Sequence, residues 1–367
     1  MAQRLLLTQT VIHTTRTSSA MPAAKPLLLI SLSMLLVASL LVSLVLGSVT
    51  IPLEDVFRVL SGEQASKAIW TTIILNLRLP QAITAILAGA ALGVSGLLMQ
   101  TFFRNPLADP FVLGVSSGAS LGVALVVLTI GSVTTTLLTG LGLFGDLALA
   151  VAASMGSAGV MVIVLWVARR VASGTTLLVI GLLFGYLTSA AVSVLLYFSI
   201  PERIQAYINW TFGNFSGVTW DQLAVIMPIV IVGLVIVFLL SKPLNVLLMG
   251  EAYASSMGVN LRRVRISLIM ITALLAGTIT AFCGPIGFLG IAVPHFCRSL
   301  FNTSDHRILI PTTILMGATV ALIASIIADV PGSSLVLPLN AVTALIGAPA
   351  VIWVILGRQN MKETFAS

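Results

Sequence analysis

Long apolar runs separated by short polar segments occupy almost all of this 367-residue chain. Ten runs approach the ~20 residues that an α-helix needs to cross about 30 Å of hydrocarbon. The runs are continuous rather than alternating, so helices, not barrel strands, would satisfy the backbone polar groups within a bilayer. The pattern predicts an all-α polytopic membrane protein with ten transmembrane helices at about 27–47, 80–101, 114–131, 146–168, 175–198, 222–241, 266–283, 286–300, 308–328 and 341–357.

Proline and glycine mark several element boundaries. Only Gly284 and Pro285 separate the seventh run from the eighth, which predicts that the eighth span is short or broken. Pro201 predicts the start of a short helix that reaches about Phe212. Arg104 ends the second span near a proline, and its expected role is to anchor the helix end at lipid phosphates. The segment 114–120, GVSSGAS, is typical of a face that packs closely against another helix.

Composition and charge support the membrane class and orient the chain. Only 8% of the residues are charged, far below the ~25% of globular domains. The net charge of +7 does not indicate nucleic-acid binding, because the basic residues lie singly or in small groups between apolar runs. Ten spans put both termini on one side, and that side then carries 14 of the 18 basic residues. The positive-inside rule therefore predicts cytoplasmic termini. The four basic residues predicted on the opposite side of the membrane are Arg58, Lys67, Arg78 and Arg203.

The N-terminal residues 1–25 combine basic with Ser and Thr residues, as transit peptides and signal sequences do. The apolar run that follows is too long for a signal peptide, and no A-x-A cleavage site follows it. We expect a cytoplasmic tail followed by an uncleaved first span.

The chemistry-bearing residues narrow the class further. A polytopic membrane protein can belong to one of four functional classes: a channel, a secondary transporter, a membrane enzyme or the membrane part of a pump. The eleven acidic residues lie in loops or at span ends, so no mid-membrane ion-coupling site is apparent. No lysine follows a glycine, which excludes a P-loop. Cys283 and Cys297 fit buried apolar positions. We expect no catalytic residue, no metal site and no cofactor bound by this chain.

Four stretches carry a family resemblance. They are FFRNPLADPFVLGVSSGASLG (102–122), MGEAYASSMGVNLRRVR (249–265), FCGPIGFLGIAVPHFCRSLFNTSDHRILIP (282–311) and LPLNAVTALIGAPAVIWVIL (337–356). Together they resemble the FecCD-type permease subunits of ABC importers for ferric siderophores, haem and vitamin B12. The resemblance covers about 27–358 and implies the type II importer fold. It implies one permease domain at 26–358 between cytoplasmic tails at 1–25 and 359–367.

The resemblance also implies partners and a substrate class. A homodimer in the bacterial inner membrane would bind two cytoplasmic ATP-binding subunits, which hold ATP and Mg, and a periplasmic substrate-binding protein. We expect an iron chelate, such as a ferric siderophore or haem, as the substrate. Vitamin B12 and, less readily, molybdate are the alternatives within this class. An ion-coupled secondary transporter is the rival from another class.

The segment 250–258 is the expected coupling helix, which in the family sits in a groove of the ATPase subunit. Gly250, Ala254 and Gly258 recur every four residues, so a helix would present them as a stripe of small residues that admits a close partner. An ordinary amphipathic loop helix is the alternative. The expected coupling residues are Gly250, Glu251, Ala254, Ser255, Met257 and Gly258.

The resemblance assigns two further sets of residues. Arg78 and Arg203 are expected to dock the binding protein, with interfacial anchoring as the alternative for Arg78. The expected pathway residues are Ser117, Leu196, Phe198, Tyr207, Trp210 and Phe212.

The chain also departs from the family pattern at its periplasmic face. Where relatives commonly read Glu-Leu-Pro-x-Gly, this chain has Val336 and Asn340 at the acid and glycine positions. Near the end of the ninth span, Ser325 and Asp329 stand where relatives often carry an Asp and an Arg.

Overall fold

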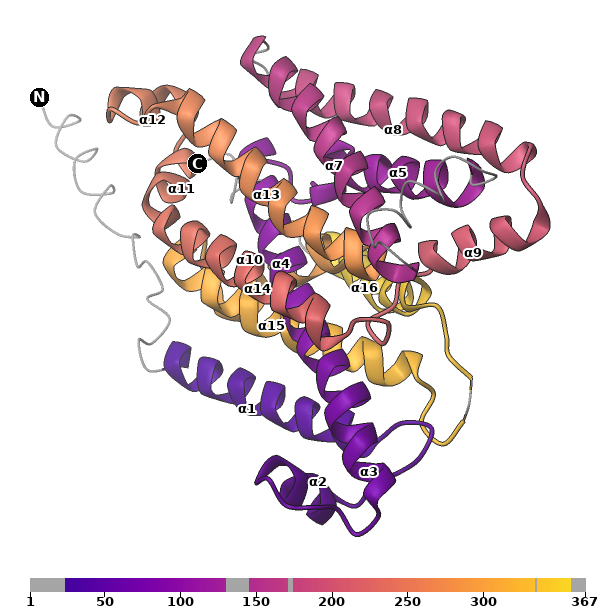
Figure 1. The fold of residues 1–367 in the computed structure, drawn as a ribbon. Helices are drawn as coiled ribbons and strands as arrows, with labels where there is room; N and C mark the ends of the chain where they lie inside the picture. Colours follow the sequence, from indigo (N-terminus) through magenta and orange to yellow (C-terminus); the bar gives the residue numbers. More distant parts are fainter. Residues whose placement is uncertain (1–23, 130–144, 171–173, 334, 358–367) are drawn as a thin grey trace, which may run out of the picture.

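The computed structural model describes residues 24–129, 145–170, 174–333 and 335–357, and these ranges contain helices and turns but no strand (Figure 1). Each of the ten expected spans coincides with one helix. These are α1 (Ala24–Val45), α4 (Leu79–Phe103), α5 (Val115–Thr129), α7 (Gly145–Arg170), α8 (Gly174–Tyr197), α10 (Trp220–Leu239), α13 (Leu261–Cys283), α14 (Leu289–Phe301), α15 (His306–Ala328) and α16 (Leu339–Gly357). The expected tails lie almost wholly outside the described residues.

Helix length separates two kinds of span. Seven described helices are long and apolar enough to cross a membrane, whereas Val115–Leu128, Leu289–Phe301 and Leu339–Pro349 are shorter apolar segments. The 13 residues of α14 extend only about 20 Å at about 1.5 Å per residue. The prediction of a short eighth span is confirmed. The turn that precedes it, residues 284–288, is therefore expected to lie inside the apolar layer rather than at its surface.

Shorter helices connect the spans: α2 (Leu53–Leu60), α3 (Ala68–Thr72), α9 (Pro201–Thr211), α11 (Ser241–Leu248) and α12 (Glu251–Ser256). α9 begins at Pro201, as predicted from the proline. A π-helical stretch, Ile73–Arg78, joins α3 to α4, so the second span belongs to a continuous helix over Ala68–Phe103. The separate helix α11 was not predicted: the expected sixth span ends at 241, where α11 begins.

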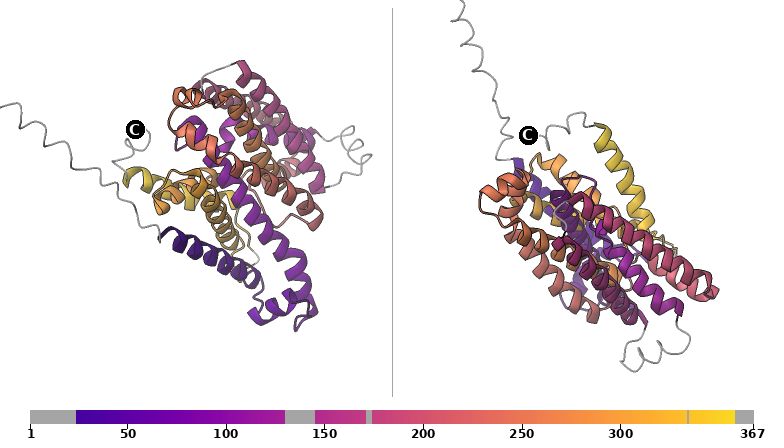
Figure 2. Two further views of the ribbon diagram at one scale, coloured as in Figure 1. Left: turned by 90° about the vertical axis from the view of Figure 1, so that its left-hand side faces the viewer. Right: turned by 90° about the horizontal axis from the view of Figure 1, so that it is seen from above.

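The long helices share one general direction, and α4 lies among them (Figure 2). α4 packs against α13, α14 and α15, while α5 packs against α7 and α8. α2 and α3 lie at the opposite end of the molecule from α11 and α12 (Figure 1). The positive-inside prediction makes the α11–α12 end cytoplasmic.

Glycines allow the central helices to approach each other closely. A Cβ on Gly89 would lie 2.0 Å from the carbonyl oxygen of Gly317, and one on Gly96 would lie 1.8 Å from that of Gly290. A Cβ on Gly118 would lie 2.5 Å from the carbonyl oxygen of Gly156. No side chain fits at such distances, so backbones are in direct contact, as membrane helix pairs with small residues favour. The tight packing predicted for Gly118 is confirmed.

Candidate coupling site and translocation pathway

The short helix α12 is bounded by two glycines in left-handed or extended positive-φ conformations. Gly250 has φ 115° and Gly258 has φ 81°, and both lie outside the helix, which covers Glu251–Ser256. Glycine adopts such φ values without the strain that a side chain would add. The predicted stripe of Gly250, Ala254 and Gly258 along one helix is therefore wrong, since only Ala254 is helical.

Burial also corrects the place of Ala254. Its side chain is fully buried and belongs to the main hydrophobic core, so it faces the permease and not an outside partner. The outward face carries Tyr253, 46% exposed, and Met257, 57% exposed, together with the exposed Ser255 and Gly258. Of the expected coupling residues, Ser255, Met257 and Gly258 thus lie where another protein can reach them. Their role in coupling stays a prediction.

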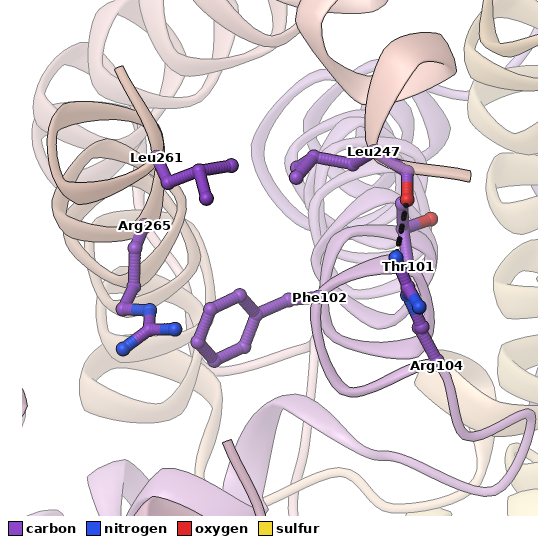
Figure 3. A pocket seen from close by; sticks show the side chains of 6 residues that line it. All are labelled: Thr101, Phe102, Arg104, Leu247, Leu261 and Arg265. Atoms are coloured by element: carbon purple, nitrogen blue, oxygen red, sulfur yellow. Dashed lines mark hydrogen bonds between the residues drawn. The ribbon is translucent and has the colours of Figure 1, made fainter. Parts of the chain in front are cut away.

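Arg104 connects α4 to the segment that leads into α12 (Figure 3). It ends α4 with φ 48°, and its Nη2 donates to the carbonyl oxygen of Leu247 at 3.0 Å. Close by, the guanidinium of Arg265 lies 5.7 Å from the centre of the Phe102 ring, within the range of a cation–π contact. Arg104 was expected to anchor the helix at the lipid surface, but its guanidinium instead bonds another helix. Sequence spacing does not reveal this bond, because its partner is a backbone atom 143 residues away.

A polar network around His306 forms a second connection at the same end of the molecule. Its Nδ1 lies 2.8 Å from Asn245 Oδ1 on α11, and its Nε2 lies 2.8 Å from Thr101 Oγ1 on α4. Because an amide oxygen only accepts, Nδ1 carries the proton. Asn245 Nδ2 donates to Asp305 Oδ1 at 2.6 Å. The helices α4, α11 and α15 are therefore tied together, and α11 is the helix that precedes α12 in the chain.

Asp305 caps α15 within this network. Its Oδ1 accepts from the backbone N–H of Arg307 at 2.9 Å. Burial raises the pKa of the Asp305 carboxyl. The hydrogen bonds from Arg307 and Asn245, together with the nearby positive charge of Arg307, lower it by more than burial raises it, so the net pKa is below the ordinary value. The carboxylate is thus ionised where it accepts both bonds.

The expected pathway residues divide into two groups. Leu196, Tyr207 and Trp210 gather in one apolar cluster against α5, with the Tyr207 and Trp210 ring centres 6.4 Å apart. Phe198, 80% exposed, and Phe212, 42% exposed, point away from the molecule. Ser117 Oγ lies 3.5 Å from the Cβ position of Gly185, so Ser117 faces α8. The structure brings three of the six together and leaves their transport role a prediction.

The two arginines expected to dock a binding protein make bonds within the chain. Arg78 is only 8% exposed, and its Nη1 donates to the carbonyl oxygens of Leu44 at 2.6 Å and Val45 at 3.0 Å. Its Nη2 donates to the carbonyl oxygen of Val49. Arg203 Nη1 lies 3.4 Å from the carbonyl oxygen of Leu128. Arg78 thus holds the end of α1, and docking stays a prediction for both.

The two departures near the end of α15 meet one partner on α4. Gln81 Nε2 donates to Asp329 Oδ2 at 2.7 Å and to Ser325 Oγ at 3.1 Å. These residues and Arg78 line a cavity of about 510 Å³. The altered charges therefore belong to an internal polar contact between α4 and α15.

Comparisons with known proteins agree with this architecture. The model of the FecCD transport family matches residues 35–357. The vitamin B12 import system permease protein BtuC of Klebsiella pneumoniae subsp. pneumoniae is 38% identical over 328 residues, 89% of this chain and 93% of the relative. BtuC of Shigella boydii is 36% identical over 89% of this chain and 94% of its own. A metal-chelate type ABC transporter solved in an inward-facing conformation matches with a TM-score of 0.78 and 29% identity, covering 90% of this chain and 99% of that one.

Proposed function

This chain belongs to the FecCD transport family and is a permease of an ABC importer, and we propose that two copies of it carry a large metal chelate across the bacterial inner membrane. The proposed substrate is an iron chelate, and vitamin B12, itself a cobalt chelate, is the alternative that the BtuC relatives favour. The permease breaks no covalent bond in this scheme. Two cytoplasmic ATP-binding subunits hydrolyse ATP, and a periplasmic binding protein delivers the chelate.

One observation carries the proposal of ATP-driven coupling. The exposed face of α12, with Tyr253 and Met257, projects from the end of the molecule at which Arg104 ties α4 to Leu247. Aromatic and methionine side chains are enriched at protein–protein interfaces relative to the rest of the protein surface. A partner that binds this face and moves on ATP binding would displace α12. The bonds of Arg104 and His306 would carry that displacement to α4 and α15.

The second copy of the chain is proposed to cover the outer face of α8. Tyr186, Leu187 and Tyr197 are each more than 60% exposed in the single chain. Phe198, also exposed, directly follows the last residue of the same helix. Paired across a twofold axis, such faces would enclose an apolar pathway. An apolar wall suits a large chelate that must pass without being held, since strong polar contacts would slow its release.

Reconstitution into lipid vesicles tests the proposal. Permease, ATP-binding subunit and binding protein are combined, and uptake of radiolabelled ferric siderophore, haem and cobalamin is measured with ATP supplied on the side of the ATP-binding subunit. Uptake of one chelate class should require ATP and should stop when the P-loop lysine of the partner subunit is replaced. Uptake sustained by a proton or sodium gradient without ATP would refute the proposal and favour a secondary transporter.

A further inference from the structure

The turn between α13 and α14, residues 284–288, is recessed among other segments. Ile286 is 1% exposed, and because α14 has only 13 residues we expect this turn to lie below the membrane surface. Backbone polar groups in such a place need partners from the protein, because hydrocarbon offers none. At the start of the turn, the backbone N–H of Asn214 donates to the carbonyl oxygen of Cys283 at 2.8 Å.

Asn340 stands near the start of α16, where the family pattern has a glycine. It supplies a second hydrogen-bond partner for the backbone of the turn. Its side-chain Oδ1 accepts from the backbone N–H of Gly287 at 3.0 Å. Its own backbone N–H donates to the carbonyl oxygen of Phe212, at the end of α9, also at 3.0 Å. A glycine at position 340 could make the second bond but not the first. The side chain of Asn340 therefore adds a bond that joins the turn to α16.

Steric contacts press the turn against the same two helices. A Cβ on Gly284 would lie 2.4 Å from the carbonyl oxygen of Trp210 on α9. A Cβ on Gly347 of α16 would lie 2.7 Å from the Cβ of Phe288. Phe288 itself has φ 68°, a conformation that costs free energy in a non-glycine residue and persists only where its surroundings hold it. The turn, α9 and α16 thus form one packed unit.

We propose that Asn340 is a positioning residue, whose side-chain carbonyl holds the 284–288 turn closed against α9 and α16. The three segments move as one unit when the outer mouth, the periplasmic end of the proposed pathway, opens. Only the reference to an outer mouth rests on the proposed function. The closed turn itself can be measured in a permease that transports nothing, so failure of one proposal does not imply failure of the other.

Cys283 provides the probe, because its side chain is 3% exposed and it directly precedes the turn. In a C297A background, Cys283 is the one remaining cysteine of the 367-residue chain. The rate of its alkylation by N-ethylmaleimide then reports opening of the turn. Asn340→Ala removes the acceptor for Gly287, whereas Asn340→Asp keeps a carbonyl-type oxygen at the same place. We expect Asn340→Ala to raise the alkylation rate about tenfold and Asn340→Asp to stay near the parent rate.

Two results would overturn the proposal. One is an unchanged rate in Asn340→Ala, and the other is an equal rise in Asn340→Ala and Asn340→Asp. Should a variant fail to fold, hydrogen exchange in the parent chain decides. The amide of Gly287 should then be strongly protected, and exchange at the rate of an unstructured peptide would equally refute the proposal.

Discussion

The guanidinium of Arg104 donates a hydrogen bond to the carbonyl oxygen of Leu247 at 3.0 Å and thereby joins α4 to the end of α11. The most apolar part of the span that contains α4 has a larger share of buried residues than that of any other candidate span among the described residues. α11 leads through Gly250 directly into α12. A displacement of α12 therefore reaches the centre of the bundle through a charged hydrogen bond, which is stronger than a neutral one.

Replacing Arg104 should weaken coupling. Arg104→Leu removes a charge-assisted bond of about 1.5–3 kcal/mol, so chelate uptake per ATP hydrolysed should fall about tenfold or more. The measurement is the ratio of uptake to ATP hydrolysis in reconstituted vesicles. Arg262→Leu is the matched control, because Arg262 is exposed near α12, and it should leave the ratio unchanged. Equal ratios in both variants would contradict the role of Arg104.

Substitutions in α12 and at its C-cap should separate docking from folding. Met257→Arg places a charge on the exposed face, so the permease should remain folded but lose co-elution with the ATP-binding subunit on size exclusion. Ala254→Arg forces a charge into the core, where an unpaired charge is costly, and should abolish a monodisperse permease. Normal folding of Ala254→Arg would show that the buried position of this residue is wrong.

The contact between Gly89 and Gly317 should tolerate no side chain. Gly89→Ala should lower the melting temperature in detergent strongly, because its Cβ would overlap a backbone oxygen at 2.0 Å. Gly159→Ala in α7 is the control, since a Cβ there meets nothing within 4 Å. It should be neutral or stabilising, as alanine favours a helix by up to about 1 kcal/mol over glycine. A similar melting temperature for both variants would argue against direct backbone contact.

Asp109 should make stability depend on pH between about 4 and 7. Burial raises the pKa of its carboxyl to about 6, and the N–H of Phe111 lowers it only in part. A raised carboxyl pKa means that the folded state binds the proton more tightly, so stability is lost as the pH rises from the unfolded pKa through about 6. The loss amounts to at most about 3 kcal/mol.

Thermal unfolding in detergent at pH 5 to 7.5 measures this effect. The melting temperature of the parent should fall over this range, and Asp109→Asn should remove that part of the fall. Asp305→Asn is the contrasting control. The pKa of Asp305 is lowered, so its contribution is present above its unfolded pKa and is lost only as the pH falls through a lower value. A parent curve that Asp109→Asn leaves unchanged would exclude Asp109 as the cause.

Hydropathy and turn chemistry predicted the framework of this fold correctly. Ten apolar runs became ten helices, because a backbone in hydrocarbon must bond to itself. α9 begins at Pro201, because proline restricts the local backbone to a conformation that suits the first turn of a helix. α13 ends just before Gly284, because glycine permits backbone conformations outside the helix. The order of the FecCD-type motifs was also sufficient for the family and its transport class.

The separate helix α11 and the bonding of the charged residues could not be predicted in this way. Arg104 and Arg78 both donate to backbone carbonyls of distant segments, and such acceptors leave no mark in a sequence. Asn340 appeared as an unexplained departure until its neighbours Phe212 and Gly287 were placed beside it.

The sequence by itself determined that this protein is an all-helical membrane permease, where its spans lie and which family it belongs to. These properties depend on local apolar length and on motif order. Only the tertiary structure decided which side of each helix is inside. Ala254 illustrates the difference: its spacing from Gly250 and Gly258 predicted a surface for a partner, but its burial against the core shows that its side chain points inward, whereas Gly258 is exposed. Which side of a helix faces the core depends on the neighbouring helices, and the residue pattern along one helix carries no information about where those neighbours lie.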